Sequence, residues 1–358
     1  LVGDQSAAQI LLQIVPRVTS LTLLSGGAVR VVGQGFVEGN GTVYEWAGAA
    51  VTDFSGTVGP NVTDANNTTV DLPRTVHGTG PFTVRTAGGT SVPVEVNHLD
   101  QGLIVVQDVA FNAAAGELLV ADQSEIYRID PATGQTLGHY PIPETPFSFD
   151  TIGLHMTTAA ISSLGGTAVA AGNLLVSNRI GLIPERIFAV SPTTGAQLAS
   201  VGLQDFLQPV AVLLHPTRGT IFLLSSFATI VEINPATGAT VGSFTVPFTV
   251  QRGGLAIDPT NGNIWAGSHT QTSVTEFTPT GTLVRTVSLA SQGLKVNEQT
   301  GLAFHPDGSL LVSATVGASG VFGLVYKFTL PPSPASAESL SHLTTASSVA
   351  TAPVATSS

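Results

Sequence analysis

The chain has 358 residues, with 39 glycines, 22 prolines and no cysteine. Only 10% of the residues are charged and the net charge is −11, which excludes a basic surface of the kind that binds nucleic acid. The absence of cysteine excludes disulfides, thiolate catalysis and cysteine-based metal sites. The apolar content of 43% is too high for a chain that is disordered throughout, and no stretch reaches the roughly 18 apolar residues of a membrane span.

Residues 1–15 are predicted to be a linker or the last strand of a preceding module, because they contain the short apolar segment QILLQIV. The chain begins at Leu1 without a methionine. We therefore expect a mature product, or a piece cut from a longer multidomain protein.

Residues 16–99 contain short alternating segments separated by Gly and Asn, which predicts a β-sandwich. Pro16 is followed by VRVVGQGF ending at Phe36, by TTVDLP ending at Pro73 and by GPFTVRTAGG ending at Gly89. This order resembles the IPT/TIG family of immunoglobulin-like modules. The resemblance implies an immunoglobulin-like fold for this region.

Four N-x-Thr sequons fall in the same region, which makes them weak candidates for glycosylation in a secreted protein. Their acceptor residues are Asn40, Asn61, Asn66 and Asn67.

Residues 100–331 contain a repeat about 43 residues long. A Pro-Gly turn recurs with its last glycine at Gly134, Gly195, Gly238 and Gly281, between two alternating apolar segments. In phase with it run buried-looking segments that end in one polar residue, such as VLLH at His215 and GLAID at Asp258. The repeat thus contains four antiparallel strands, A to D, which is the pattern of a β-propeller blade.

We count five such units, which predicts a five- or six-bladed propeller. An insertion around residues 157–171 explains the longer second repeat, and the fifth unit lacks an evident strand D after Lys327. Closure of the ring therefore needs a strand from elsewhere, and residues 92–99 are one candidate.

The segments from Asp108 to Gly134 and from Thr300 to Ala314 resemble the NHL, YVTN and SMP-30/gluconolactonase type of propeller. That resemblance implies a divalent metal held by three side chains. Asp108 matches the first ligand position, whereas Thr300-Gly301 and Gly253-Gly254 stand where the other two ligands are expected. With one of three ligands present, the residues argue against a lactonase of that type.

Ligands of propellers usually lie over the central channel, on the face that carries the D-to-A and B-to-C loops. Acidic groups and one arginine just before the innermost strands would suit a cation or a polar ligand there, and the alternative is a solvated channel mouth with internal ion pairs. The candidate ligand-binding residues are Asp108, Asp122, Asp150, Asn178, Gln208, Arg252, His269 and Glu298. Asp108, Asp150, Arg252 and Glu298 are the candidates for catalysis, and Asp108, Asp150 and Glu298 those for binding Ca²⁺ or another divalent cation.

His155, His215 and His305 recur one per blade together with Asn112 and Asp258, and we interpret this column as structural A-to-B turns rather than as a metal site. Asp258 to Asn263 resembles a calcium loop but is better explained as such a turn. Four phenylalanines in the D-to-A loops are predicted to wedge between blades, and the alternative is a grip on a glycan or peptide. They are Phe147, Phe149, Phe206 and Phe248.

Residues 332–358 are rich in Ser, Thr, Ala and Pro, which predicts a disordered tail. The chain contains no G-x-S-x-G, H-E-x-x-H or nucleotide-binding motif. Our leading hypothesis is an extracellular or cell-surface binding or scaffold protein, not an enzyme, whose channel face binds a polar ligand, a glycan or a protein partner. The alternatives are a metal-assisted hydrolase or lyase at the channel mouth, and a subunit of a surface filament or layer.

Overall fold

A computed structural model describes residues 14–39, 41–54, 68–122, 124–143, 152–178, 185–294, 296, 298–316 and 322–332. The chain divides into two compact units, Leu1–Phe328 and Thr329–Ser358, and every described strand lies in the first. Strand pairing is antiparallel throughout the described part, and the helical segments there are two short 3-10 turns, η1 (Ser25–Gly27) and η2 (Ala290–Gln292). The all-β prediction is confirmed. The four sequons at Asn40, Asn61, Asn66 and Asn67 lie outside the described residues.

The N-terminal region forms two antiparallel sheets around one core, as the sequence predicts for a β-sandwich. Val31 and Leu72 from one sheet pack against Tyr44, Phe82 and Val84 from the other, and all five are buried. The first sheet contains β1 (Arg17–Leu23), β2 (Val29–Gln34) and β5 (Thr69–Leu72). The second contains β4 (Ala49–Asp53), β3 (Thr42–Trp46), β6 (Gly80–Thr86) and β7 (Gly89–Thr90), with β8 (Val94–Val96) paired to β6.

Five four-stranded sheets follow within the described part of the chain, each a blade of a β-propeller. Blade 1 contains β10 (Asp108–Asn112), β11 (Glu117–Asp122), β12 (Glu125–Ile129) and β13 (Thr136–Pro141). Blade 2 contains β14 (Ile152–Met156), β17 (Leu174–Asn178), β18 (Arg186–Val190) and β19 (Gln197–Gly202). Blade 3 contains β20 (Pro209–Leu214), β21 (Ile221–Ser225), β22 (Thr229–Ile233) and β23 (Thr240–Thr245). Blade 4 contains β24 (Gly253–Ile257), β25 (Ile264–Ser268), β26 (Ser273–Phe277) and β27 (Leu283–Ser288).

Blade 5 takes its outer strand from the N-terminal side of the propeller. Its strands are β28 (Glu298–Phe304), β29 (Leu310–Val316), β30 (Phe322–Phe328) and β9 (His98–Leu99). Leu99 pairs with Val325 and His98 with Tyr326, and the Lys327 amide donates a hydrogen bond of 2.8 Å to the Asn97 carbonyl. The predicted closure by a strand within residues 92–99 is confirmed, and the described strands form a ring of five blades.

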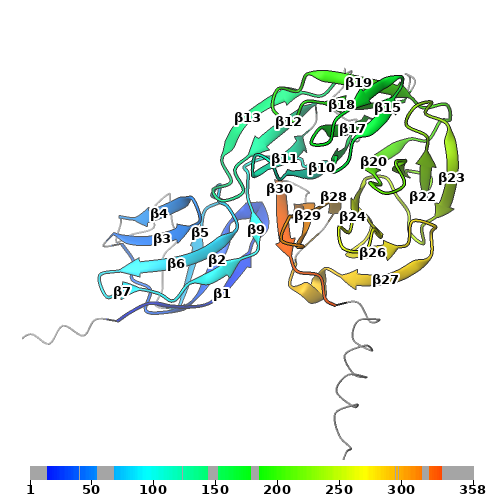
Figure 1. Ribbon diagram of the computed structural model, residues 1–358. Helices are drawn as coiled ribbons and strands as arrows, with labels where there is room; N and C mark the ends of the chain where they lie inside the picture. Colours follow the sequence, from blue (N-terminus) through cyan, green and yellow to red (C-terminus); the bar gives the residue numbers. More distant parts are fainter. Residues whose placement is uncertain are drawn as a thin grey trace, which may run out of the picture. The chain divides into compact units, whose positions relative to one another are not determined.

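The apolar core of the propeller lies between neighbouring blades, because each blade is buried on both faces. Ala110 and Leu119 of blade 1 share a cluster with Leu154 and Phe188 of blade 2, and similar clusters join blades 2 and 3, 3 and 4, and 5 and 1. β10, β20, β24 and β28 lie nearest the centre of the ring, and β13, β19, β23 and β27 lie outermost (Figure 1). The first strand of each blade therefore lines the central channel.

The outer strands of blades 1 to 4 share one irregularity. The register between each outer strand and strand C of its blade shifts by one residue near the C-to-D turn. The outer-strand residue left without a partner at this shift is an exposed aliphatic one. These four residues are Leu137, Leu198, Val241 and Val284. Bulges of this kind hinder further strands from adding to an open sheet edge.

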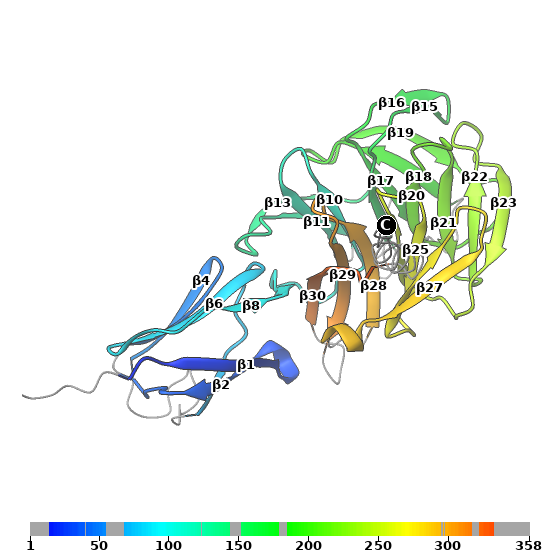
Figure 2. The same ribbon diagram turned by 60° about the horizontal axis from the view of Figure 1, so that its bottom comes forward.

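The insertion in blade 2 forms a two-stranded hairpin, β15 (Ile161–Leu164) and β16 (Thr167–Val169). The hairpin lies beside β19 (Figure 2). Ile161, Leu164 and Val169 are buried in the cluster between blades 2 and 3, so the insertion extends the core rather than the channel.

Candidate ligand-binding site

Near their N-terminal ends the innermost strands of neighbouring blades come into direct backbone contact. A Cβ added at Gly254 would lie 2.2 Å from the Leu302 amide nitrogen, and one added at Gly153 would lie 2.5 Å from the Ala211 Cα. Glycine is required at both positions because any side chain would meet backbone. The inner strands of blades 4 and 5, and those of blades 2 and 3, thus pack directly against each other.

Asp108 is buried among the inner strands at the same end. Its carboxylate accepts hydrogen bonds of 2.7 Å from the Val109 amide and of 2.7 Å from the Leu154 amide, and it also accepts one from Leu302. It thus joins the inner strands of blades 1, 2 and 5. The side chain is fully buried, and this burial raises the pKa of the carboxyl well above its usual range even though the three amides oppose the rise. The geometry gives Asp108 a role in holding the ring together.

The other predicted residues at this end are dispersed. Arg252 and Glu298 come together, with Nη1 3.8 Å from Oε2 and both side chains more than two-fifths exposed. Gln208 has a left-handed backbone with φ of 46°, held by hydrogen bonds of 2.8 and 3.0 Å from its amide to the Glu185 carboxylate. Asp122 is half-buried, and this burial, together with Glu125, raises its pKa to about 6.

His269 lies next to Arg252 at this end of the propeller. Its backbone amide donates a hydrogen bond of 3.1 Å to the Arg252 carbonyl. Asp150 and the side chain of Asn178 lie outside the described residues. Among the residues that the structure describes, no three His, Asp or Glu side chains are placed to hold a metal ion. A polar or cation site at this end stays a prediction.

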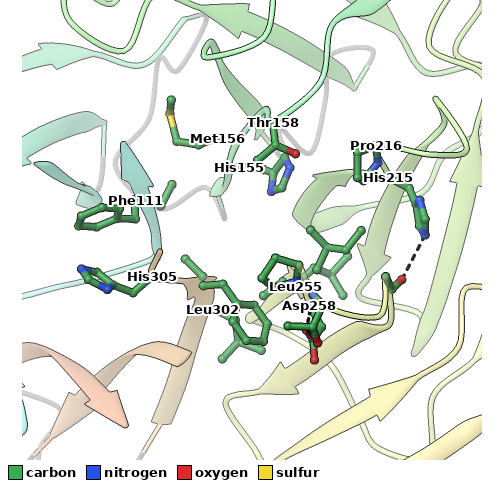
Figure 3. Close-up of a pocket in the computed structure, with 18 of the residues that line it drawn as sticks. Phe111, His155, Met156, Thr158, His215, Pro216, Leu255, Asp258, Leu302 and His305 are labelled. Carbon is green, nitrogen blue, oxygen red and sulfur yellow. Dashed lines mark hydrogen bonds between the residues drawn. The ribbon is translucent and has the colours of Figure 1, made fainter. Parts of the chain in front are cut away.

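At their C-terminal ends the innermost strands enclose a cavity of about 880 Å³. Its floor is apolar and is built by Val109, Leu154, Leu255 and Leu302, with Met156 at one side. All five blades contribute to the lining, because His215 and its turn extend β20 into the same space. Figure 3 shows the labelled side chains arranged around one opening.

The rim of the cavity consists of the A-to-B turns. In four blades the residue at the end of strand A, or directly after it, accepts a hydrogen bond through its carbonyl from the amide of a glycine three or four positions later, and that glycine has positive φ. The pairs are Asn112 with Gly116, His215 with Gly219, Asp258 with Gly262 and His305 with Gly308. The interpretation as structural turns is confirmed for these four residues, including the hairpin from Asp258 to Asn263, whereas His155 lies within β14 and pairs with Leu175. The sequence did not predict that four residues of the column, His155, His215, Asp258 and His305, line a cavity.

His155 differs from the other two histidines of the rim. Its Nε2 is buried and has no hydrogen-bond partner among the described residues, and its ring borders the cavity (Figure 3). Burial lowers its pKa to about 4, so the ring is neutral at pH 7. The His155 ring therefore adds no charge to the cavity wall.

The predicted loop phenylalanines behave in two ways. Phe248 packs against the cluster between blades 3 and 4, which confirms the wedge interpretation for this residue. Phe206 is 60% exposed and lies 6.2 Å, centroid to centroid, from Phe227, which is 57% exposed. Phe147 and Phe149 lie outside the described residues.

Comparisons with known proteins give structural similarities only. No family model matches the chain, and no curated protein matches it. A glutaminyl cyclase from Myxococcus xanthus is 15% identical with a TM-score of 0.43, over 64% of this chain and 93% of the cyclase. A streptogramin B lyase is 13% identical with a TM-score of 0.38, over 80% of this chain and 98% of the lyase. A protein of unknown function from Bacteroides thetaiotaomicron is 12% identical with a TM-score of 0.40, over 88% and 86% of the two chains.

These levels of identity and TM-score carry no information on ligand or reaction. Separately, none of the helices in the described part of the chain is long and apolar enough to cross a membrane.

Proposed function

We propose that this protein is a binding protein, not an enzyme, and that its propeller holds a small, mainly apolar molecule in the cavity among the A-to-B turns. The observation that carries the proposal is the cavity itself. About 880 Å³ lies within the range of small-molecule pockets, and its apolar floor would remove most of a bound molecule from water. The floor comes from rigid inner strands of separate blades, so the site is formed before the ligand arrives.

The metal-assisted hydrolase or lyase is the weaker alternative. Its proposed site depends on Asp108, whose carboxylate already accepts hydrogen bonds from three backbone amides. Binding a metal there would break the contacts that join three blades.

We further propose an extracellular or cell-surface location and an IPT/TIG-like identity for the N-terminal sandwich. The lack of cysteine and the low charge support the location, and the segment order from Pro16 to Gly89 supports the module. In this arrangement the sandwich would link the ligand-binding propeller to neighbouring modules.

The cavity proposal is tested by narrowing its mouth. Ala113 and Ala115 are both exposed in the same A-to-B turn, but only Ala113 lines the cavity. Wild type should bind 1-pyrenemethanol, a fluorescent neutral probe, at one saturable site. Ala113→Trp should weaken this binding at least tenfold because the indole occupies the mouth, and the matched control Ala115→Trp should leave it unchanged. Equal binding by both variants, or no binding by wild type, would contradict the proposal.

A further inference from the structure

The charged groups that line the cavity are engaged within the protein. Arg218 forms a two-pronged ion pair with Glu232, with Nε 2.8 Å and Nη2 2.9 Å from the two carboxylate oxygens. This pair neutralises the only guanidinium that the described residues contribute to the lining. The Arg218 guanidinium is therefore not free to act as a counter-ion for an anionic ligand.

Among the described residues of the lining, Asp258 is the only carboxylate. Its Oδ1 accepts hydrogen bonds of 2.9 Å from the Thr260 amide and of 2.6 Å from the Thr260 hydroxyl, and the residue is buried. Oδ1 is thus engaged within its own turn, and these bonds hold the carboxylate against the turn.

Two of the three imidazoles of the rim have partners within the protein. His215 Nε2 lies 3.2 Å from the Gly262 carbonyl and Nδ1 lies 3.2 Å from the Thr217 hydroxyl. His305 Nδ1 lies 2.8 Å from Asp307, which also binds Lys327 at 2.7 Å. His155 has no partner among the described residues and is neutral at pH 7 because burial lowers its pKa.

We infer that the cavity selects an uncharged, largely apolar ligand and discriminates against charged molecules of the same shape. This inference rests on the proposed function and names the ligand class for it. A charged group brought onto the apolar floor would lose its hydration without gaining a counter-ion, and such a loss is costly. A neutral molecule of the same ring structure would gain the burial of its apolar surface without that loss.

The test uses three probes with one ring system, namely 1-pyrenemethanol, 1-pyrenecarboxylic acid and 1-pyrenemethylamine. At pH 7.5 they are neutral, anionic and cationic, and each is titrated against the full chain by fluorescence. We expect the neutral probe to bind at least tenfold more tightly than either charged probe. Ala113→Trp should weaken the binding of the neutral probe, which locates the site in the cavity.

The possible failures are distinguishable. If none of the three probes binds, the proposed function fails and this inference fails with it. If the acid binds as tightly as the alcohol, the cavity binds ligands but the inference on their charge is wrong. If the amine binds as tightly as the alcohol and loses that affinity in Asp258→Asn, the carboxylate acts as a counter-ion and the inference is also wrong. The Asp258→Asn variant keeps an oxygen that can accept the Thr260 bonds, so its fold should be preserved.

Discussion

Leu99→Asp should lower the free energy of unfolding by about 4 kcal/mol or more, which is the largest effect that we expect from a single substitution in the core. Leu99 is 2% exposed and packs with Val106, Val109 and Val325 between blades 5 and 1. It is also one of the two residues of β9, the strand that closes the ring. A carboxylate placed there would have no partner and would separate β9 from β30.

The measurement is the free energy of unfolding from urea denaturation. Val92→Asp introduces the same carboxylate seven residues earlier at a side chain that is 81% exposed, and it should change the free energy by less than about 0.5 kcal/mol. A loss of under about 1 kcal/mol for Leu99→Asp would show that β9 does not close the ring as described.

Lowering the pH should also destabilise the pairing of β9 with β30, because His98 of β9 is a buried histidine. The His77 and His98 rings lie 5.2 Å apart, centroid to centroid, and His98 also contacts Tyr326. Burial, with a smaller contribution from His77, lowers the pKa of His98 from 6.5 to about 3. Burial also lowers the pKa of His77, partly opposed by its bond to the Gly78 carbonyl and by Asp100, which is paired with Arg74.

The lowered pKa values of His98 and His77 determine how the stability changes with pH. A histidine whose pKa is lower in the folded state contributes its full stability above pH 6.5 and loses it as the pH falls. Between pH 7.5 and pH 5 the loss from His98 alone is about 2 kcal/mol. Asp108 and Asp122 act in the opposite direction, because their raised pKa values favour the folded state at lower pH.

The comparison of wild type with His98→Phe isolates the histidine contribution, because the carboxylates are common to both proteins. Unfolding at pH 7.5 and at pH 5 should show a smaller loss of stability in the variant, by about 2 kcal/mol. The control His139→Phe removes an imidazole that is 54% exposed and should lose as much stability as wild type. An equal loss in wild type and His98→Phe would contradict the assignment.

The repeat made the architecture predictable from the sequence. Turns such as Asp130 to Gly134 combine proline, glycine and an Asx residue, and their recurrence every 43 residues or so dictates both the blade and its strand order. The missing fifth strand D was also evident, and residues 92–99 were the right place to look for it. Its reduction to the two residues His98 and Leu99 depends on tertiary pairing with β30 and was not predictable.

The site was less predictable because it depends on the geometry of the ring. The sequence placed Asp108 at the start of an inner strand, but only the structure shows that Gly153 and Gly254 bring the strands into contact at that end. His155, His215 and Asp258 were recognised as one column, and the signal for a cavity was present in the apolar residues that precede each of them. What the sequence did not show is that those strand ends leave open space between them.

The most direct test of the cavity as a binding site uses the only methionine of the chain. Met156 lines the cavity (Figure 3), so labelling with ¹³C-methyl methionine gives one NMR signal from the proposed site. Titration with 1-pyrenemethanol should shift this signal by the ring current of the probe, and the shift should saturate with the dissociation constant found by fluorescence. A probe that binds by fluorescence while the Met156 methyl signal stays unmoved would contradict the account.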